Sequence, residues 1–433
     1  MIAESDAGQG AEALMLFSPW CYGHYPSYLY HLIRYWQHSH RQSIQGASNN
    51  ALNSTLSTLN IVVVPRFFQE HQDVVELATA GPATIRFIAT TLEEQKNVET
   101  AASGYRRAFA QYDLMVRYAE RLKASQGLVM YFDSCQLPFV AGLKLPCPFS
   151  GIYFRPTWHY GQFTLVAPTW REQMQRWRER FFLNRLLAHP QFRTLFCLDP
   201  FVVDRINKGR RTAPAVYLPD PVEFKAAAIG EIAALKARLQ IEPGRRILMA
   251  FGRLADARKG TSELVAALSL LPIERCRQLC LLLVGEPDPN GQATLEQWLL
   301  PLRQSLPIQI VTNYSYVPES EVSHYFQLAD LILAPYQRHV GMSGILLLAA
   351  AAQKPVLSSN YGLMGELVIR YGLGLAVDTT CPKQITQALY RFLLEPIDCL
   401  FNSKQARCFA EQNSPEQFAS TIFQHLQSHP ISA

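Results

Sequence analysis

The sequence is short of charge, of paired cysteines and of long apolar runs. Charged residues make up 17% of the 433, whereas 48% are hydrophobic, and this balance excludes a disordered chain. The nine cysteines form no CxxC pair and are odd in number, which argues against a disulfide framework and a zinc ribbon. No apolar run reaches the roughly 20 residues of a membrane span, and the start MIAESDAGQG does not resemble a signal peptide. We therefore expect a folded cytoplasmic protein, either soluble or attached peripherally to the inner face of a membrane.

The small net charge gives no general case for a nucleic-acid partner, because 40 Lys and Arg stand against 35 Asp and Glu. The excess is concentrated in residues 155–211, where 11 basic residues against four acidic ones give +7. Four apolar side chains recur there at helical spacing: Trp170, Met174, Trp177 and Phe181. We predict a basic amphipathic helix over 170–187. Its aromatic stripe either faces the core, which is the commoner arrangement, or contacts an anionic membrane.

Short apolar runs alternate with amphipathic stretches along the chain, and this rhythm is typical of parallel βαβ units. Residues 93–124 are expected to form one long helix, and 137–157 a loop because four prolines interrupt it. After VYLPDP at 216–221 the rhythm restarts. We predict an α/β protein with two Rossmann-like, doubly wound domains, residues 1–216 and 217–413. A C-terminal helix follows in 414–433, and the sequence does not indicate where it docks.

In the first domain, polar residues follow two predicted strands at the edge where open α/β sheets bind ligands. Gly23 permits a tight turn after the first strand, and His24 is placed to face a substrate. Asp133 ends a later strand, where it could orient His24 or merely cap the next element. Arg155 and His159, in GIYFRPTWHY, are further candidates for the acceptor side. The alternative for that stretch is a loop packed by its own aromatic residues.

The segment FGRLADARKG, residues 251–260, carries cations ahead of a predicted helix start. Arg253, Arg258 and Lys259 stand beside amide groups that a helix N-terminus leaves unpaired. Such an arrangement suits a diphosphate, because the cations and the helix dipole act on the same anion. The alternative is a solvated basic loop.

This segment, together with residues 317–368, resembles the donor-binding domain of GT-B glycosyltransferases, and most closely the large family-4 group of retaining enzymes. The matching strings are the GR…KG cations, VPESEVSHYFQLADLILAPY, a small-residue helix ending in KPV, and YGLMGELV. They occur in the expected order over roughly residues 245–392. The resemblance implies a GT-B fold, in which two Rossmann-like domains face a central cleft.

The resemblance also assigns roles to residues. Arg253 and Lys259 would hold the leaving nucleoside diphosphate and neutralise its charge, so that no metal ion is needed. Gly252, Val317 and Glu366 would lie at the donor sugar or nucleotide. The donor would be a nucleoside-diphosphate sugar with no further cofactor, and the acceptor, whether small molecule, glycan or lipid, is not specified.

The sequence departs from the family at two positions. These enzymes usually carry two glutamates eight positions apart, and the corresponding residues here are Val340 and Leu348. No Asp or Glu occurs between Asp330 and Glu366, so a small shift in alignment does not restore the pair. Ser343 and Gly344 instead offer a hydroxyl and amide groups at a predicted helix start, where a phosphate or sugar hydroxyl could bind. The alternative for Ser343 is an ordinary N-cap.

The resemblance therefore implies a hexosyltransferase that is retaining and metal-independent. Three alternatives stay open. One is a GT-B-shaped binding protein that has lost catalysis with the glutamates. Another is an enzyme with the same fold but a different reaction, as in the GT-B sugar-nucleotide epimerases. The third is an inverting enzyme in which His24 deprotonates the acceptor and Asp133 stabilises the imidazolium.

Overall fold

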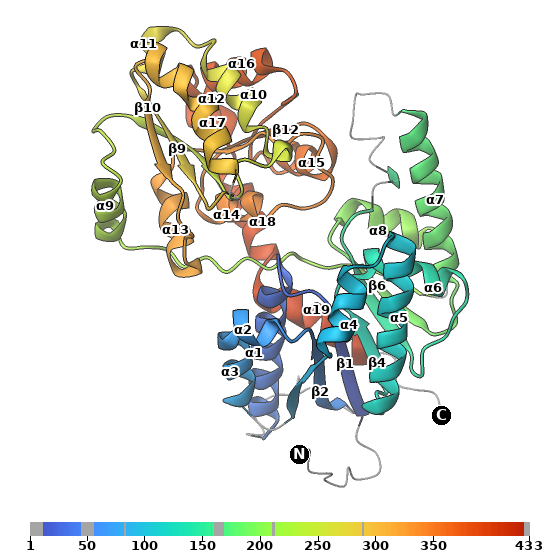
Figure 1. The fold of residues 1–433 in the computed structure, drawn as a ribbon. Coiled ribbons are helices and arrows are strands. Elements are labelled where there is room, and N and C mark those ends of the chain that lie inside the picture. The colour runs from blue at the N-terminus through green and yellow to red at the C-terminus, as the bar shows by residue number, and fades with distance from the viewer. Residues whose placement is uncertain are drawn as a thin grey trace. The chain divides into compact units, whose positions relative to one another are not determined.

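The computed structural model describes residues 12–44, 56–81, 84–156, 158–159, 169–209, 213–287 and 290–427, without the side chains of 42–44. Part of the GIYFRPTWHY stretch and Arg210 and Arg211 of the basic region lie outside these residues. The described chain divides into two compact units (Figure 1). The N-terminal unit holds described residues up to His159, those from Thr169 to Pro221, and Pro415–Gln427. The C-terminal unit holds Val222–Ser414.

The N-terminal unit is built on a seven-stranded parallel sheet in the order β3-β2-β1-β4-β5-β6-β7. The strands are β1 (Glu12–Ser18), β2 (Leu56–Val63), β3 (Ile85–Ala89), β4 (Gln126–Val129), β5 (Phe149–Tyr153), β6 (Phe192–Cys197) and β7 (Ala215–Tyr217). Strands β4 and β5 are buried along their whole length, as strands covered by helices on both faces must be.

The helices of this unit correct two expectations. They are α1 (Tyr25–Ile44), α2 (Phe67–Glu70), α3 (Gln72–Thr79), α4 (Leu92–Glu99), α5 (Gly104–Arg121), α6 (Gln136–Val140), α7 (Trp170–Leu187), α8 (Pro200–Asn207) and α19 (Pro415–Gln427). The single helix expected over 93–124 is two helices, because Ser103 accepts a hydrogen bond from Arg106 N and begins α5 anew. The loop expected over 137–157 contains most of α6 and all of β5.

Helix α7 also differs from the commoner expectation for its aromatic stripe. Its buried residues are Leu183, Leu186 and Leu187, all in the last turns. Trp170 and Trp177 are 65% and 72% exposed. The core-facing placement of the stripe was therefore wrong.

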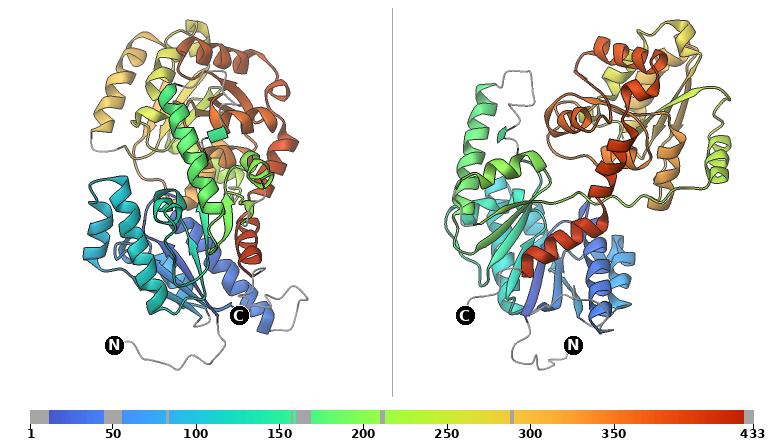
Figure 2. Two further views of the ribbon diagram at one scale, coloured as in Figure 1. Left: turned by 90° about the vertical axis from the view of Figure 1, so that its right-hand side faces the viewer. Right: turned by 180° about the vertical axis from the view of Figure 1, so that it is seen from behind.

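The C-terminal helix α19 packs on the N-terminal unit rather than on the unit that precedes it in the chain (Figure 2). Phe418 meets Tyr28 of α1, with ring centroids 4.7 Å apart. Phe423 stacks on Tyr35 and lies 5.4 Å from the ring of Trp36. The chain thus returns to complete the core of its first unit.

The C-terminal unit holds a six-stranded parallel sheet in the order β10-β9-β8-β11-β12-β13. Its strands are β8 (Arg246–Phe251), β9 (Leu279–Val284), β10 (Gln309–Asn313), β11 (Leu331–Ala334), β12 (Val356–Ser359) and β13 (Gly374–Val377). Its helices are α9 (Ile229–Arg238), α10 (Thr261–Leu268), α11 (Ile273–Cys276), α12 (Gly291–Ser305), α13 (Glu319–Leu328), α14 (Gly344–Ala351), α15 (Gly362–Arg370), α16 (Pro382–Leu394), α17 (Ile397–Leu400) and α18 (Ser403–Gln412).

Each sheet has one point where the strand order reverses. In the N-terminal unit the chain runs outward from β1 to β3 and then returns to β4 on the other side of β1. In the C-terminal unit the same reversal occurs between β8 and β11, which are neighbours in the sheet. Open α/β sheets bind ligands at the carboxyl ends of the strands at such a point. Among the described residues, no helix is both long and apolar enough to cross a membrane.

Candidate functional site

The loops after β8 and β11 meet at the switch point of the C-terminal sheet. The first loop, residues 252–260, carries the predicted cations, and the second, 335–343, carries the hydroxyl of Ser343. The amide of Gln337 donates to the carbonyl of Arg258 over 2.7 Å. Because this backbone hydrogen bond joins the two loops, their side chains share one site.

Two glycines fix the path of the first loop. Gly252 and Gly260 have φ angles of 105° and 67°, which favour glycine. A Cβ atom on Gly260 would lie 2.0 Å from the carbonyl oxygen of Pro335. The close approach of the loops therefore requires a residue without a side chain just before α10.

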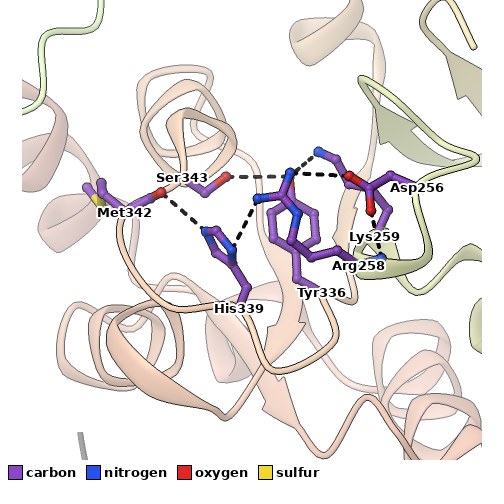
Figure 3. A network of polar contacts seen from close by, with 7 residues as sticks. All are labelled: Asp256, Arg258, Lys259, Tyr336, His339, Met342 and Ser343. Atoms are coloured by element: carbon purple, nitrogen blue, oxygen red, sulfur yellow. Dashed lines mark hydrogen bonds and ion pairs between the residues drawn. The ribbon is translucent and has the colours of Figure 1, made fainter. Parts of the chain in front are cut away.

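Tyr336 is the centre of a polar network at this site, and Lys259 is one of its partners (Figure 3). The Nζ of Lys259 donates to the hydroxyl of Tyr336 over 2.6 Å and lies 4.3 Å from the centre of that ring. The Ser343 hydroxyl donates to the same Tyr336 oxygen over 3.4 Å. Tyr336 thus holds the lysine and the serine together, one from each side of the switch point.

Two further cations lie on the same loop as Lys259. The Arg258 guanidinium lies 3.5 Å from Nδ1 of His339 and also 3.5 Å from a carboxylate oxygen of Asp256 (Figure 3). Arg253 is exposed, and among the described residues its guanidinium has no hydrogen-bond or ion-pair partner. Three cations therefore stand against one carboxylate in residues 252–260, which leaves the loop attractive to an anion.

Ser343 occupies the N-cap position of α14, but its side chain accepts no capping hydrogen bond. The ordinary N-cap alternative was thus wrong, because the hydroxyl is directed to Tyr336 instead. Gly344, the first residue of α14, presents its amide at the same helix end. Val340 and Leu348 are half-buried, so the positions of the two missing glutamates are filled by aliphatic side chains.

The remaining predicted donor residues also follow strands of this sheet. Val317, which is buried, comes after β10 and next to the exposed Tyr316. Glu366 lies in α15, after β12, and its carboxylate forms an ion pair with Arg370 at 2.6 Å. Glu366 is therefore engaged by a helix neighbour in this structure.

In the N-terminal unit, His24 and Asp133 both follow strands at the switch point, but they are not joined. Among the described residues, no hydrogen bond or ion pair links them. Asp133 accepts hydrogen bonds from the amides of Phe154 and Arg155 at 2.9 and 3.0 Å. Desolvation raises the pKa of Asp133 to about 7, against these hydrogen bonds and the Arg155 charge, which lower it. Asp133 therefore positions the backbone after β5, and in the described residues the alternative base pair of His24 and Asp133 is not in contact.

Near His24 lies a carboxylate from a distant part of the chain that the sequence did not single out, Asp220. Gly23 has a φ of 73°, as its tight turn requires. Tyr28 donates its hydroxyl to the buried Asp220, and burial raises the pKa of Asp220 while the charge of His24 lowers it. The carboxylate that interacts electrostatically with His24 is therefore Asp220, which follows β7 in the chain.

His159 is not a cleft residue in this structure. It is 2% exposed, and its Nε2 lies 2.9 Å from a carboxylate oxygen of Asp199, whose side chain is also fully buried. Asp199 caps α8 by accepting from the amide of Phe201. His159 therefore takes part in the packing of the N-terminal unit, which corrects its placement among the acceptor residues. Arg155, by contrast, is exposed.

Tyr336 and His339 are the site residues that sequence reasoning gave no role. Both follow β11 closely, and Tyr336 comes one residue after Pro335. The position after a buried strand is a signal that could have indicated them. Their pairing with Lys259 and Arg258 depends on β8 and β11 being neighbours, which the strand order alone determines.

Comparison with known proteins supports the reading of these motifs. Residues 245–395 match the family model described as glycosyl transferases group 1. A search of curated proteins finds no match. Among solved structures, the chain is similar to a glycosyltransferase from Rickettsia africae, with a TM-score of 0.65 and 14% identity over 96% of this chain and 99% of that one.

Two further structures are similar over nearly their whole length. Sucrose-phosphate synthase from Thermosynechococcus elongatus has a TM-score of 0.64 and 17% identity, covering 96% of this chain and 98% of that chain. An Anabaena protein solved in complex with UDP has a TM-score of 0.64 and 12% identity, covering 96% and 100%. The chain therefore has a GT-B fold, and its residues 245–395 match the glycosyl transferases group 1 model, as their motifs predicted.

Proposed function

We propose that the protein is a glycosyltransferase that takes a sugar from a nucleoside-diphosphate donor bound at the C-terminal switch point. The observation that carries this proposal is the presence of three cations, Arg253, Arg258 and Lys259, on the loop after β8, which a backbone hydrogen bond joins to the loop after β11. The match of residues 245–395 to a glycosyltransferase family supports it. So does the UDP complex of a structural neighbour, which has the same fold.

In this proposal the cations do the electrostatic work of the reaction. Breaking the bond between sugar and diphosphate places negative charge on the leaving oxygen. Lys259 is held by Tyr336 at a fixed position, and Arg253 is exposed and available to the second phosphate. Charges fixed in advance stabilise the leaving group without reorganisation, so we propose that no divalent ion is required.

We further propose that transfer retains the configuration at the anomeric carbon. An inverting mechanism needs a base close to the acceptor, and the predicted pair of His24 and Asp133 is not joined. The aliphatic side chains of Val340 and Leu348 remove the usual carboxylates, and we propose that the leaving diphosphate itself takes the acceptor proton. NMR analysis of the product's anomeric configuration tests this point, and an inverted product would contradict it.

Calorimetry tests donor binding directly. UDP, GDP, ADP and dTDP are titrated into the protein, and at least one is expected to bind. The double variant Arg253→Ala, Lys259→Ala should weaken that binding at least about 100-fold, because hydrogen bonds to charged groups contribute about 1.5–3 kcal/mol each. The matched control is Arg277→Ala, Lys404→Ala, which removes two exposed cations elsewhere on the C-terminal unit. Equal affinity in both double variants would overturn the site.

Turnover distinguishes the transferase from the alternative of a binding protein without catalysis. The nucleotide sugar that matches the best-binding diphosphate is incubated with EDTA and without it. Release of the diphosphate in both conditions is expected. Binding without any release, over a broad set of acceptors, would favour the binding protein.

A further inference from the structure

Helix α7 presents an aromatic stripe that nothing described in the structure covers. Trp170, Met174, Trp177 and Phe181 are 65%, 60%, 72% and 47% exposed. At 100° per residue they fall within about 60° of one another, so they form one continuous stripe. Trp177 and Phe181 stack with their ring centroids 6.0 Å apart. A stripe of this size is unusual on a surface that meets only water.

The opposite face of α7 anchors the helix to its unit. Leu183, Leu186 and Leu187 are buried against the core near its C-terminal end. Glu179 on this face accepts a hydrogen bond from Tyr153 of β5, and Glu172 is used in the capping box with Thr169. Figure 1 shows the N-terminal part of α7 extending beyond α6 and β6. The stripe is therefore directed outward by the way the helix is attached.

Charge separates the two faces as well. Both acidic residues of α7 project about opposite the stripe, at roughly 180° and 200° from Trp170. Five arginines lie on the flanks of the stripe or behind them: Arg171, Arg176, Arg178, Arg180 and Arg185. The outward side of the helix therefore combines aromatic and thioether groups with cations, and carries no carboxylate.

We propose that α7 is an interfacial helix that docks the N-terminal unit on an anionic lipid surface. Tryptophan and phenylalanine insert between headgroups, and the arginines on the flanks reach the lipid phosphates. Charge complementarity selects this occupant over an apolar protein surface, because cations on both flanks would be left unpaired against an apolar partner. The inference concerns a surface of the N-terminal unit and does not depend on donor chemistry.

Vesicle co-sedimentation of the full-length protein tests the proposal. Vesicles of phosphatidylcholine alone are compared with vesicles containing 30% phosphatidylglycerol, a composition chosen for the assay. Binding is expected only to the anionic vesicles and should fall steeply with salt. The triple variant Arg171→Gln, Arg178→Gln, Arg185→Gln should weaken it about 100-fold, since each arginine near an anionic surface contributes about 1 kcal/mol.

A second variant separates the aromatic contribution. Trp170→Ser, Trp177→Ser should also abolish sedimentation with anionic vesicles. The matched control is Tyr105→Ser, Arg106→Gln, which removes an exposed aromatic ring and a cation from α5. Circular dichroism and the melting temperature establish that each variant is folded.

Tryptophan fluorescence distinguishes direct contact of the stripe with lipid from a merely structural role of its residues. Brominated anionic lipid should quench the tryptophan emission of the wild-type protein. Trp170→Phe, Trp177→Phe keeps the apolar stripe, so this variant should still bind vesicles but lose most of the quenching. Binding that ignores phosphatidylglycerol, or that survives in the serine variant, would overturn the proposal. So would self-association of the chain that the same serine variant abolishes, because the stripe would then contact a second copy.

Discussion

At the scale of single residues, Asp133 has an unusual environment for a carboxyl group. It is half-buried after β4 and accepts two backbone hydrogen bonds, yet desolvation raises its pKa to about 7. The folded protein therefore holds the Asp133 proton more tightly than the unfolded chain, whose aspartate pKa is about 3.9. Stability from this group is full below about pH 4 and is lost as the pH rises through about 7.

Asp133→Asn should remove this dependence on pH. Between pH 5 and 8 the wild-type free energy of unfolding is expected to fall by about 2 kcal/mol more than that of the variant. Urea denaturation at several pH values measures the difference. Asp113→Asn, at an exposed position on α5, serves as the control and should follow the wild type. Parallel curves for all three proteins would show that Asp133 is ionised throughout.

At the scale of elements, α19 shows that sequence order and packing order differ. The helix follows the C-terminal unit in the chain but places Phe423 between Tyr35 and Trp36 of α1. Phe423 is fully buried. Truncating such a ring leaves a cavity that the surroundings fill only in part.

Phe423→Ala should therefore destabilise the N-terminal unit by about 3–5 kcal/mol. Denaturation followed by the fluorescence of Trp36 and its neighbours measures this loss. Leu394→Ala, at a half-exposed position in α16, should change the free energy of unfolding by less than about 0.5 kcal/mol. If Phe423→Ala costs no more than this control, then α19 does not contribute to the core of the first unit.

The same scale shows what the sequence could predict. The alternation of apolar and amphipathic runs predicted both sheets. A strand such as β9, with the sequence LCLLLV, is apolar at every position and therefore fits only the interior of a parallel sheet that is covered on both faces. Strand β5 was missed because prolines surround it, with Pro148 just before the strand and Pro156 after it, and they indicated a loop. Gly151 is needed there, since a Cβ atom at that position would lie 2.6 Å from the ring of Phe132. A tertiary contact thus set the residue, and local pattern could not reveal it.

The sequence predicted those site residues that lie close together in the chain, but not the contacts between residues that are far apart in it. Arg253 and Lys259 share one loop with a helix start, so their pattern was visible in ten residues. The contact of Lys259 with Tyr336 joins positions 77 apart and depends on β8 lying beside β11. The pairing of His24 with Asp133 failed for the same reason. Both residues follow neighbouring strands, β1 and β4. The local sequence does not show in which direction their side chains point, nor that Asp220 lies close to His24 in the fold.

At the scale of the whole molecule, the chemistry divides between two units, and the described residues pass from one to the other at two places. They pass from the first unit to the second at Pro221 and Val222 and return at Ser414 and Pro415. The cations proposed to bind the donor all lie in the second unit, whereas His24, Asp133 and the stripe of α7 lie in the first. A nucleoside diphosphate without a sugar should therefore stabilise one unit and leave the other unchanged.

Hydrogen exchange can locate that effect. The nucleoside diphosphate that binds most tightly is added at about 100 times its Kd, where it stabilises the state that binds it by about 2.7 kcal/mol. Amide exchange should slow by up to about 100-fold in residues 252–260 and 336–346, because opening these loops now requires release of the ligand. Segments 19–25 and 131–134 of the N-terminal unit should exchange at their original rates. Protection confined to those N-terminal segments would place the nucleotide at the other switch point, and the proposed roles of Arg253 and Lys259 would then fall.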